Sequence, residues 1–224
     1  MLRFGRLRKL LREKALNIEL WDHGYNLYKF KPLSWLLGPF TFRTGLSDGN
    51  GRMTGKDFDI VVSNNSPKEY SEIFSRSPEN HTLKNILTFD VVVFKNCFPT
   101  TKIETKEKLE KYKNYYKNII ENISKYPNKF IVFTPPSLRR EMTTPEWASN
   151  ARELSEWLIR QETKNVKIFN FFDLLADKNT NTLRRDYCNL LFFDSHPNIK
   201  ANRDLGKEFV KFLIRTTSPF GYII

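Results

Sequence analysis

The chain has 224 residues, of which 40% are hydrophobic, and its Lys and Arg outnumber its Asp and Glu by 37 to 25, a formal net charge of +12. This length suits one large domain over residues 1–224. No apolar run of about 18 residues occurs, so we expect no membrane span, and the basic start lacks the apolar stretch of a signal peptide. The two cysteines are far apart and fit no metal spacing, so a reduced, cytoplasmic setting is the default.

The positive charge is spread along the chain rather than gathered in blocks. In residues 105–129, Lys and Glu alternate on a helical pattern, as on a solvated helix face. No nucleic-acid recognition motif accompanies the charge, so nucleic acid is not the expected partner. The cysteine and histidine spacings of metal sites and the glycine-rich phosphate cradles are also missing from the sequence, and we expect no metal and no cofactor.

Helical and strand patterns alternate along the chain. An amphipathic pattern predicts a helix at 3–14, and alternating apolar residues predict a strand at 15–21. Residues 31–69 are rich in Pro, Gly, Asn and Asp and predict a long irregular insertion. The remaining elements, each recognised by its periodicity or its caps, are a short helix at 70–74, strands at 90–94, 130–134 and 166–172, and helices at 105–124, 145–161 and 202–214.

This order of elements predicts an α/β fold in three layers, with a mostly parallel sheet between two layers of helices. Ligands of such sheets bind beyond the carboxyl ends of the strands. Four segments therefore become candidates for a site: residues 22–24, 95–99, 134–136 and the loop that contains His196.

Histidine is the commonest general base near neutral pH, and the chain has three. His23 and His196 lie at predicted strand ends or loops, whereas His81 lies in a polar stretch and is expected at the surface. Asp194 precedes His196 by two residues and could orient its ring, as the Asp of a Ser-His-Asp triad does. Asp194 could instead cap a turn.

The segment Phe193-Asp194-Ser195-His196-Pro197-Asn198 resembles the last block of SGNH-type (GDSL-like) hydrolases, which precedes their C-terminal helix. The resemblance extends over most of the chain. Residues 20–26 stand where the family has its oxyanion glycine, and residues 90–99 stand where it has its oxyanion asparagine. It implies a flavodoxin-like sheet.

The resemblance also implies roles for individual residues. His196 would be the general base and Asp194 its orienter, while Gly24 and Asn96 would donate hydrogen bonds to a developing oxyanion. The substrate pocket would be bordered by three further residues, which are His23, Asn26 and Pro135.

Two features depart from the family pattern. The spacing here is Asp-x-His rather than Asp-x-x-His, so either the turn differs or another carboxylate, such as Asp186, orients His196. The family's first strand and its nucleophilic serine also have no counterpart, because the chain begins at what looks like the helix that follows them. We therefore expect a sheet that lacks its first strand and a chain that is inactive or impaired as given.

One other segment offers a nucleophile. Gly45-Leu46-Ser47-Asp48-Gly49 matches the Gly-x-Ser-x-Gly elbow of α/β-hydrolases, with Ser47 as the attacking residue. That elbow needs a strand before it and a helix after it, and residues 50–55 do not readily start a helix. A glycine-rich turn is the favoured interpretation.

The sequence thus supports three hypotheses of different classes. The first is an esterase or deacylase that acts on an ester of a small acyl group, including one carried on a saccharide. The second is a non-catalytic ligand-binding module on the same fold, since loss of the serine removes the covalent route but leaves a cleft. The third is an anion- or nucleic-acid-binding protein that relies on its charge. The oligomeric state is left open.

Overall fold

A computed structural model of the chain describes residues 4–14, 16–24, 45–60, 63, 65–190 and 194–217. Within this part of the chain, the central sheet consists of three parallel strands in the order β3 (Val91–Phe94), β4 (Lys129–Phe133) and β5 (Val166–Phe169). Phe130 of β4 is in register with Val92 on one side and with Val166 on the other. The apolar run of β4 is what a strand covered on both faces requires, and its residues 130–133 are buried.

Alternate residues of β4 point into two different hydrophobic cores, because successive side chains of a strand face opposite ways. Phe130 and Val132 belong to one core, whereas Ile131 and Phe133 belong to the other. The sheet therefore lies between two layers of helices, and the α/β sandwich predicted from the alternation of elements is present.

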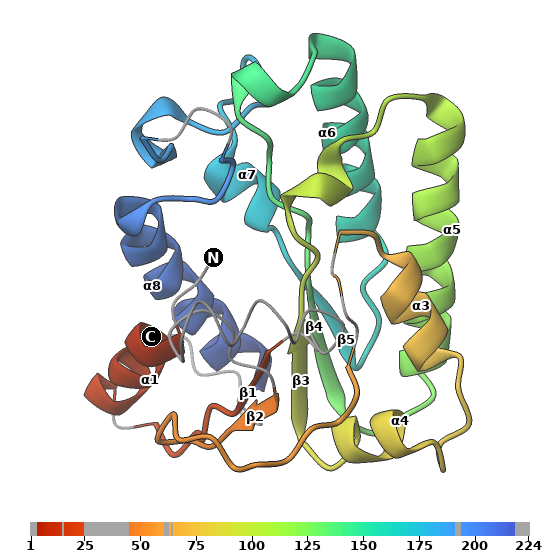
Figure 1. Cartoon of the computed structure of the whole chain (residues 1–224), viewed down its shortest axis with the longest axis vertical. Coiled ribbons are helices and arrows are strands. Elements are labelled where there is room, and N and C mark those ends of the chain that lie inside the picture. Colours follow the sequence, from red (N-terminus) through yellow and green to blue (C-terminus); the bar gives the residue numbers. More distant parts are fainter. Residues whose placement is uncertain are drawn as a thin grey trace, which may run out of the picture.

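The first core lies under four helices, which are α3 (Lys68–Phe74), α4 (His81–Ile86), α5 (Lys106–Ile123) and α6 (Pro145–Ile159). The second core lies under α1 (Phe4–Glu13), α7 (Phe171–Leu175) and α8 (Ile199–Thr217). Figure 1 shows α3 and α5 on one side of the strands and α1 and α8 on the other. Short 3-10 turns complete the described elements: η2 (Phe98–Thr101), η3 (Arg140–Met142) and η4 (Arg185–Tyr187).

The long helices begin where their capping residues predict. The Thr144 hydroxyl accepts a hydrogen bond from the Trp147 amide at 3.2 Å, and Pro145 occupies the first turn of α6. The Thr105 hydroxyl caps α5 in the same way, at 3.2 Å from the Lys108 amide. The helix expected at 202–214 starts earlier, at Ile199, because the Asn198 side chain accepts from the Ala201 amide at 3.0 Å and caps α8 there.

The strand predicted at 15–21 is wrong. Residues 16–21 form no regular element, and the strand instead is β1 (Asp22–Gly24), which pairs antiparallel with β2 (Gly45–Ser47). Leu16 and Leu20 both pack on the second core. The Arg8 guanidinium donates to the Leu20 carbonyl at 3.0 Å and to the Asp48 carbonyl at 3.0 Å. Leu16 and Leu20 thus pack on the core without forming a strand, while Ile18 between them is exposed.

Two further boundaries differ from the sequence pattern. β3 was expected to be buried, but it lies at the end of the described strand order and Val93 is 39% exposed. β5 ends at Phe169 rather than at 172, because the Asn170 side chain accepts from the Asp173 amide at 3.3 Å and starts α7.

Part of the predicted insertion at 31–69 is described. Residues 31–44 lie outside the described residues. The rest contains β2, an isolated bridge from Ser47 to Met53, and the start of α3. Among the described helices, none is long and apolar enough to cross a membrane.

Candidate functional site

Three segments that follow or adjoin the strands meet at the carboxyl edge of the parallel sheet. Residues 95–98 come after β3, residues 134–139 come after β4, and residues 194–198 come before α8. Figure 1 shows η2 beyond the carboxyl end of β3, away from α4. This is the edge at which parallel α/β sheets bind their ligands.

Asp194 and His196 form a bonded pair. Nδ1 of His196 lies 2.6 Å from Oδ1 of Asp194, and the backbone amide of His196 donates to the same oxygen at 2.8 Å. Asp194 therefore orients the ring and caps the turn at once, which the short Asp-x-His spacing permits. A carboxylate at Nδ1 keeps the proton on that nitrogen and leaves Nε2 available for proton transfer.

Asp186 does not orient the ring. Its carboxylate pairs with Arg184 at 2.9 Å and with Lys200 at 2.9 Å. The Asn189 amide instead supports the pair, because it donates to Oδ2 of Asp194 at 3.2 Å and to the His196 carbonyl at 2.6 Å.

Nε2 of His196 faces a residue that the sequence did not single out. Sγ of Cys97 lies 3.7 Å from this nitrogen, and the Phe98 ring packs edge-on against the imidazole with centroids 4.9 Å apart. Cys97 is half-buried, and 46% of the His196 side chain is exposed. The three side chains Cys97, His196 and Asp194 thus form a chain of contacts that solvent can reach.

The electrostatic surroundings of Cys97 and His196 favour the charged forms of the thiol and of the imidazole ring. Burial disfavours the Cys97 thiolate, but hydrogen bonding to His196, the charge of Lys95 and the Phe98 amide outweigh burial and lower the Cys97 pKa. The bond to Cys97 raises the His196 pKa against burial, and Asp194 adds to the rise. Burial in turn lowers the pKa of Lys95.

A buried serine holds this site together. Ser195 is fully buried, and its hydroxyl accepts from the Arg139 amide at 3.1 Å and donates to Sδ of Met142 at 3.2 Å. The Arg139 guanidinium also donates to the Asn189 carbonyl at 3.0 Å. The loop after β4 is thereby fixed to the segment that contains His196.

Two predicted residues lie at this same edge. Asn96 is 1% exposed; its amide donates to the Ser66 carbonyl at 2.8 Å and its oxygen accepts from the Tyr116 hydroxyl at 2.7 Å. These contacts fix the segment after β3. The Asn96 amide already donates to a backbone carbonyl, whereas an oxyanion-hole donor would point at the substrate position. Pro135 is buried in the loop after β4.

His23 and Gly24 have their contacts at the other end of β3. Nδ1 of His23 donates to the Gly24 carbonyl at 2.6 Å, and Nε2 accepts from the Phe58 amide at 3.0 Å. The Phe58 ring in turn contacts Phe89, which precedes β3. The structure therefore does not bring Gly24 together with Asn96 and His196. Asn26 lies outside the described residues.

Ser47 does not sit in a nucleophile elbow. It is 2% exposed in β2, its hydroxyl donates to Sδ of Met53 at 3.2 Å, and a turn rather than a helix follows at Gly49 and Asn50. The strand–turn–helix geometry that the motif requires is missing here.

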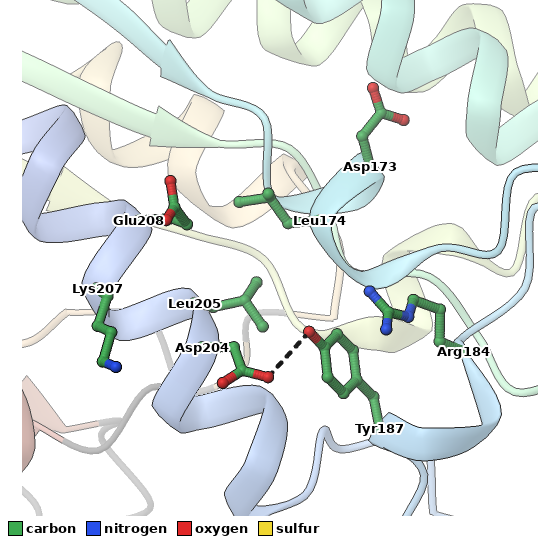
Figure 2. A pocket seen from close by; sticks show the side chains of 8 residues that line it. All are labelled: Asp173, Leu174, Arg184, Tyr187, Asp204, Leu205, Lys207 and Glu208. Atoms are coloured by element: carbon green, nitrogen blue, oxygen red, sulfur yellow. Dashed lines mark hydrogen bonds between the residues drawn. The ribbon is translucent and has the colours of Figure 1, made fainter.

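A pocket of about 330 Å³ lies elsewhere, between α7, η4 and α8. Figure 2 shows the eight side chains that line it, with a hydrogen bond of 3.2 Å from the Tyr187 hydroxyl to Asp204. Both of its aspartates are already paired, Asp173 with Arg152 and Asp204 with Lys200. Neither Cys97 nor His196 lines this pocket.

Sequence reasoning missed Cys97 because it considered cysteines only for metal ligation and disulfides. A thiol just beyond a parallel strand, at the ligand-binding edge, was the signal that could have found it. Within the described part of the chain, no group of three or more His, Cys, Asp or Glu side chains is placed to hold a metal ion.

No family model matches this chain, and no curated protein matches its sequence. Among solved structures, a chain from Streptococcus pneumonia that is provisionally described as a platelet activating factor is similar over 93% of this chain and 92% of its own length. The two chains are 13% identical and superimpose with a TM-score of 0.45. This likeness is too distant to bear on function.

Proposed function

We propose that the protein is an acyl hydrolase, an esterase or deacylase, whose centre is the Asp194–His196 pair. The observation that carries this proposal is the 2.6 Å bond from Nδ1 of His196 to Oδ1 of Asp194 at the carboxyl edge of the sheet. The resemblance of residues 90–99 and 193–198 to SGNH-type blocks supports the same reaction class.

His196 would carry the proton through the reaction. Nε2 takes a proton from the attacking group and returns it to the leaving alcohol, while the Asp194 carboxylate holds the ring and stabilises its cationic form. The exposed imidazole allows a substrate to approach. The substrate class that the resemblance implies is an ester of a small acyl group, including one carried on a saccharide.

The first prediction concerns His196. We expect His196→Gln to lower kcat/KM for p-nitrophenyl acetate and for acetylated saccharides by ~10²- to 10⁴-fold, because it removes the general base. Asp194→Asn should also lower it, because the carboxylate that selects the tautomer is gone. His81→Gln is the matched control, since His81 is exposed on α4.

Full activity in His196→Gln would contradict the proposal. A wild-type chain that hydrolyses no ester, yet gains thermal stability from acetylated saccharides in a manner lost in His196→Gln, would favour the non-catalytic binding module instead.

A further inference from the structure

We propose that Cys97 is the nucleophile of this centre, so that the chain itself contains a complete Cys97–His196–Asp194 triad. This inference takes its reaction from the proposed function. Its structural support is a separate contact, the one between Cys97 and Nε2 of His196. It changes the expectation that the chain is inactive for want of a serine.

The geometry is that of a nucleophile and its base. Nε2 of His196 is 3.7 Å from Sγ of Cys97, while Nδ1 of the same ring is held by Asp194. A nucleophile bonded to a base that a third group orients is the general arrangement of covalent acyl transfer. The two contacts use opposite nitrogens of one imidazole, so proton transfer and ring orientation do not compete.

Two serines close to the predicted sites make hydrogen bonds elsewhere. The Ser195 hydroxyl is buried between the Arg139 amide and Met142, and the Ser47 hydroxyl bonds to Met53. Cys97 is the nucleophilic side chain that contacts Nε2 within the described ranges, and it is half-buried rather than enclosed.

The surroundings of Cys97 differ from those of the second cysteine. The Lys95 charge, the His196 ring and the Phe98 amide overcome burial and lower the Cys97 pKa. At Cys188, burial raises the thiol pKa, and its sulfur contacts the carbonyl oxygens of Leu183 and Arg184. The thiolate is the reactive form of cysteine, so the two thiols should differ in reactivity.

The reaction is a balanced acyl transfer. The Cys97 thiolate attacks the ester carbonyl carbon and forms a C–S bond, while the carbonyl electron pair moves to oxygen. When that pair returns, the C–O bond breaks and the alcohol leaves with the proton from Nε2 of His196. Water then attacks the thioester as Nε2 takes its proton, the C–S bond breaks, and the carboxylic acid and thiolate are released.

Acyl trapping tests this step. Mixing the full chain with p-nitrophenyl acetate and quenching with acid should leave one acetyl group on the peptide that contains Cys97, read by intact mass and peptide mapping. Cys97→Ser should lower kcat by ~10³-fold or more, because triad members act as a unit. Cys188→Ser is the matched control and should keep wild-type activity.

Alkylation separates this inference from the proposed function, because it needs no substrate. Iodoacetamide should modify Cys97 faster than Cys188 near pH ~6, where an ordinary thiol is almost wholly protonated. His196→Gln should abolish that difference.

The outcomes are distinct. Ester hydrolysis that needs His196 but survives in Cys97→Ser overturns Cys97 as nucleophile and leaves the proposed function standing. Fast Cys97 alkylation that depends on His196, without hydrolysis of any ester, supports the activated thiol and removes the proposed substrate class. Equal alkylation of both cysteines overturns the inference.

Discussion

At the scale of single residues, His196 is bonded on both ring nitrogens to groups that stabilise its charged form. Its pKa is raised by Cys97 and Asp194, whereas the Cys97 pKa is lowered despite burial. Both shifts favour a thiolate beside an imidazolium.

The pH dependence of activity follows from these directions. Activity should rise with pH as Cys97 ionises, at a pH below the ordinary thiol range of ~8.5, and fall again as His196 loses its proton, above ~6.5. Lys95→Met removes a charge that favours the thiolate, so the rising limb should move to higher pH in a kcat/KM profile. Lys84→Met is the control, because Lys84 pairs with Glu79 at the surface. An unmoved rising limb in Lys95→Met would contradict this electrostatic account.

The sequence predicted the Asp194–His196 pair because both residues lie in one short turn. It did not predict that Cys97 faces the ring, since no local pattern links positions 99 apart. It also placed Gly24 near Asn96, an expectation that depended on a strand at 15–21. Once Leu16 and Leu20 pack under α1 instead, His23 and Gly24 pair with β2 at the amino-terminal end of β3.

At the scale of elements, α1 crosses α8 over a glycine. A Cβ added at Gly206 would meet Leu10 at 3.5 Å and Leu7 at 3.7 Å, which are ordinary van der Waals distances. Gly206→Ala should therefore raise the free energy of unfolding by up to ~1 kcal/mol, the gain in helix propensity. Urea unfolding followed by circular dichroism measures it.

Gly5→Ala in α1 is the matched control, because nothing lies within 4 Å of its added Cβ and only propensity changes. A loss of stability in Gly206→Ala alone would mean that the two helices cannot accommodate a methyl group.

Helices with a capping residue could be predicted to within a few positions, as α5 and α6 illustrate. Their Thr caps are local interactions that the sequence states directly. The C-terminal end of β5 and the start of α8 could not be predicted, because Asn170 and Asn198 act as caps only after their neighbours adopt the turns that they close.

At the scale of the whole molecule, the sheet divides the described interior into two cores. Phe133 packs against Phe169, Phe171 and Phe209, with ring centroids 4.7, 5.3 and 4.9 Å away. Leu154 of α6 is fully buried in the other core. Because both cores share β4, we expect them to unfold together.

Phe133→Ala should lower the free energy of unfolding by ~3–5 kcal/mol and Leu154→Ala should lower it by ~2–5 kcal/mol, since each substitution leaves a cavity. Both variants should lower the urea midpoint without changing the slope of the transition. Urea unfolding curves followed by fluorescence and by circular dichroism should coincide if the two cores unfold together. Two separate transitions in either variant would show that the cores unfold independently.

The layered α/β architecture was predictable, because buried apolar strands alternate with amphipathic helices. The flavodoxin-like strand order stays a prediction, since three parallel strands are described and that order involves more. The place of β3 at the end of the described strand order was not predictable, because the apolar run of residues 91–94 is equally consistent with a central strand.

The contact between Cys97 and His196 spans 99 residues of chain. Long-range contacts of this kind carry the largest loop-closure entropy and form late, after local helices and turns. A misfolded or partly assembled molecule would keep its helical signal while its sulfur behaved like any free thiol. The reactivity of Cys97 therefore reports the fraction of molecules in a preparation that have reached the native state.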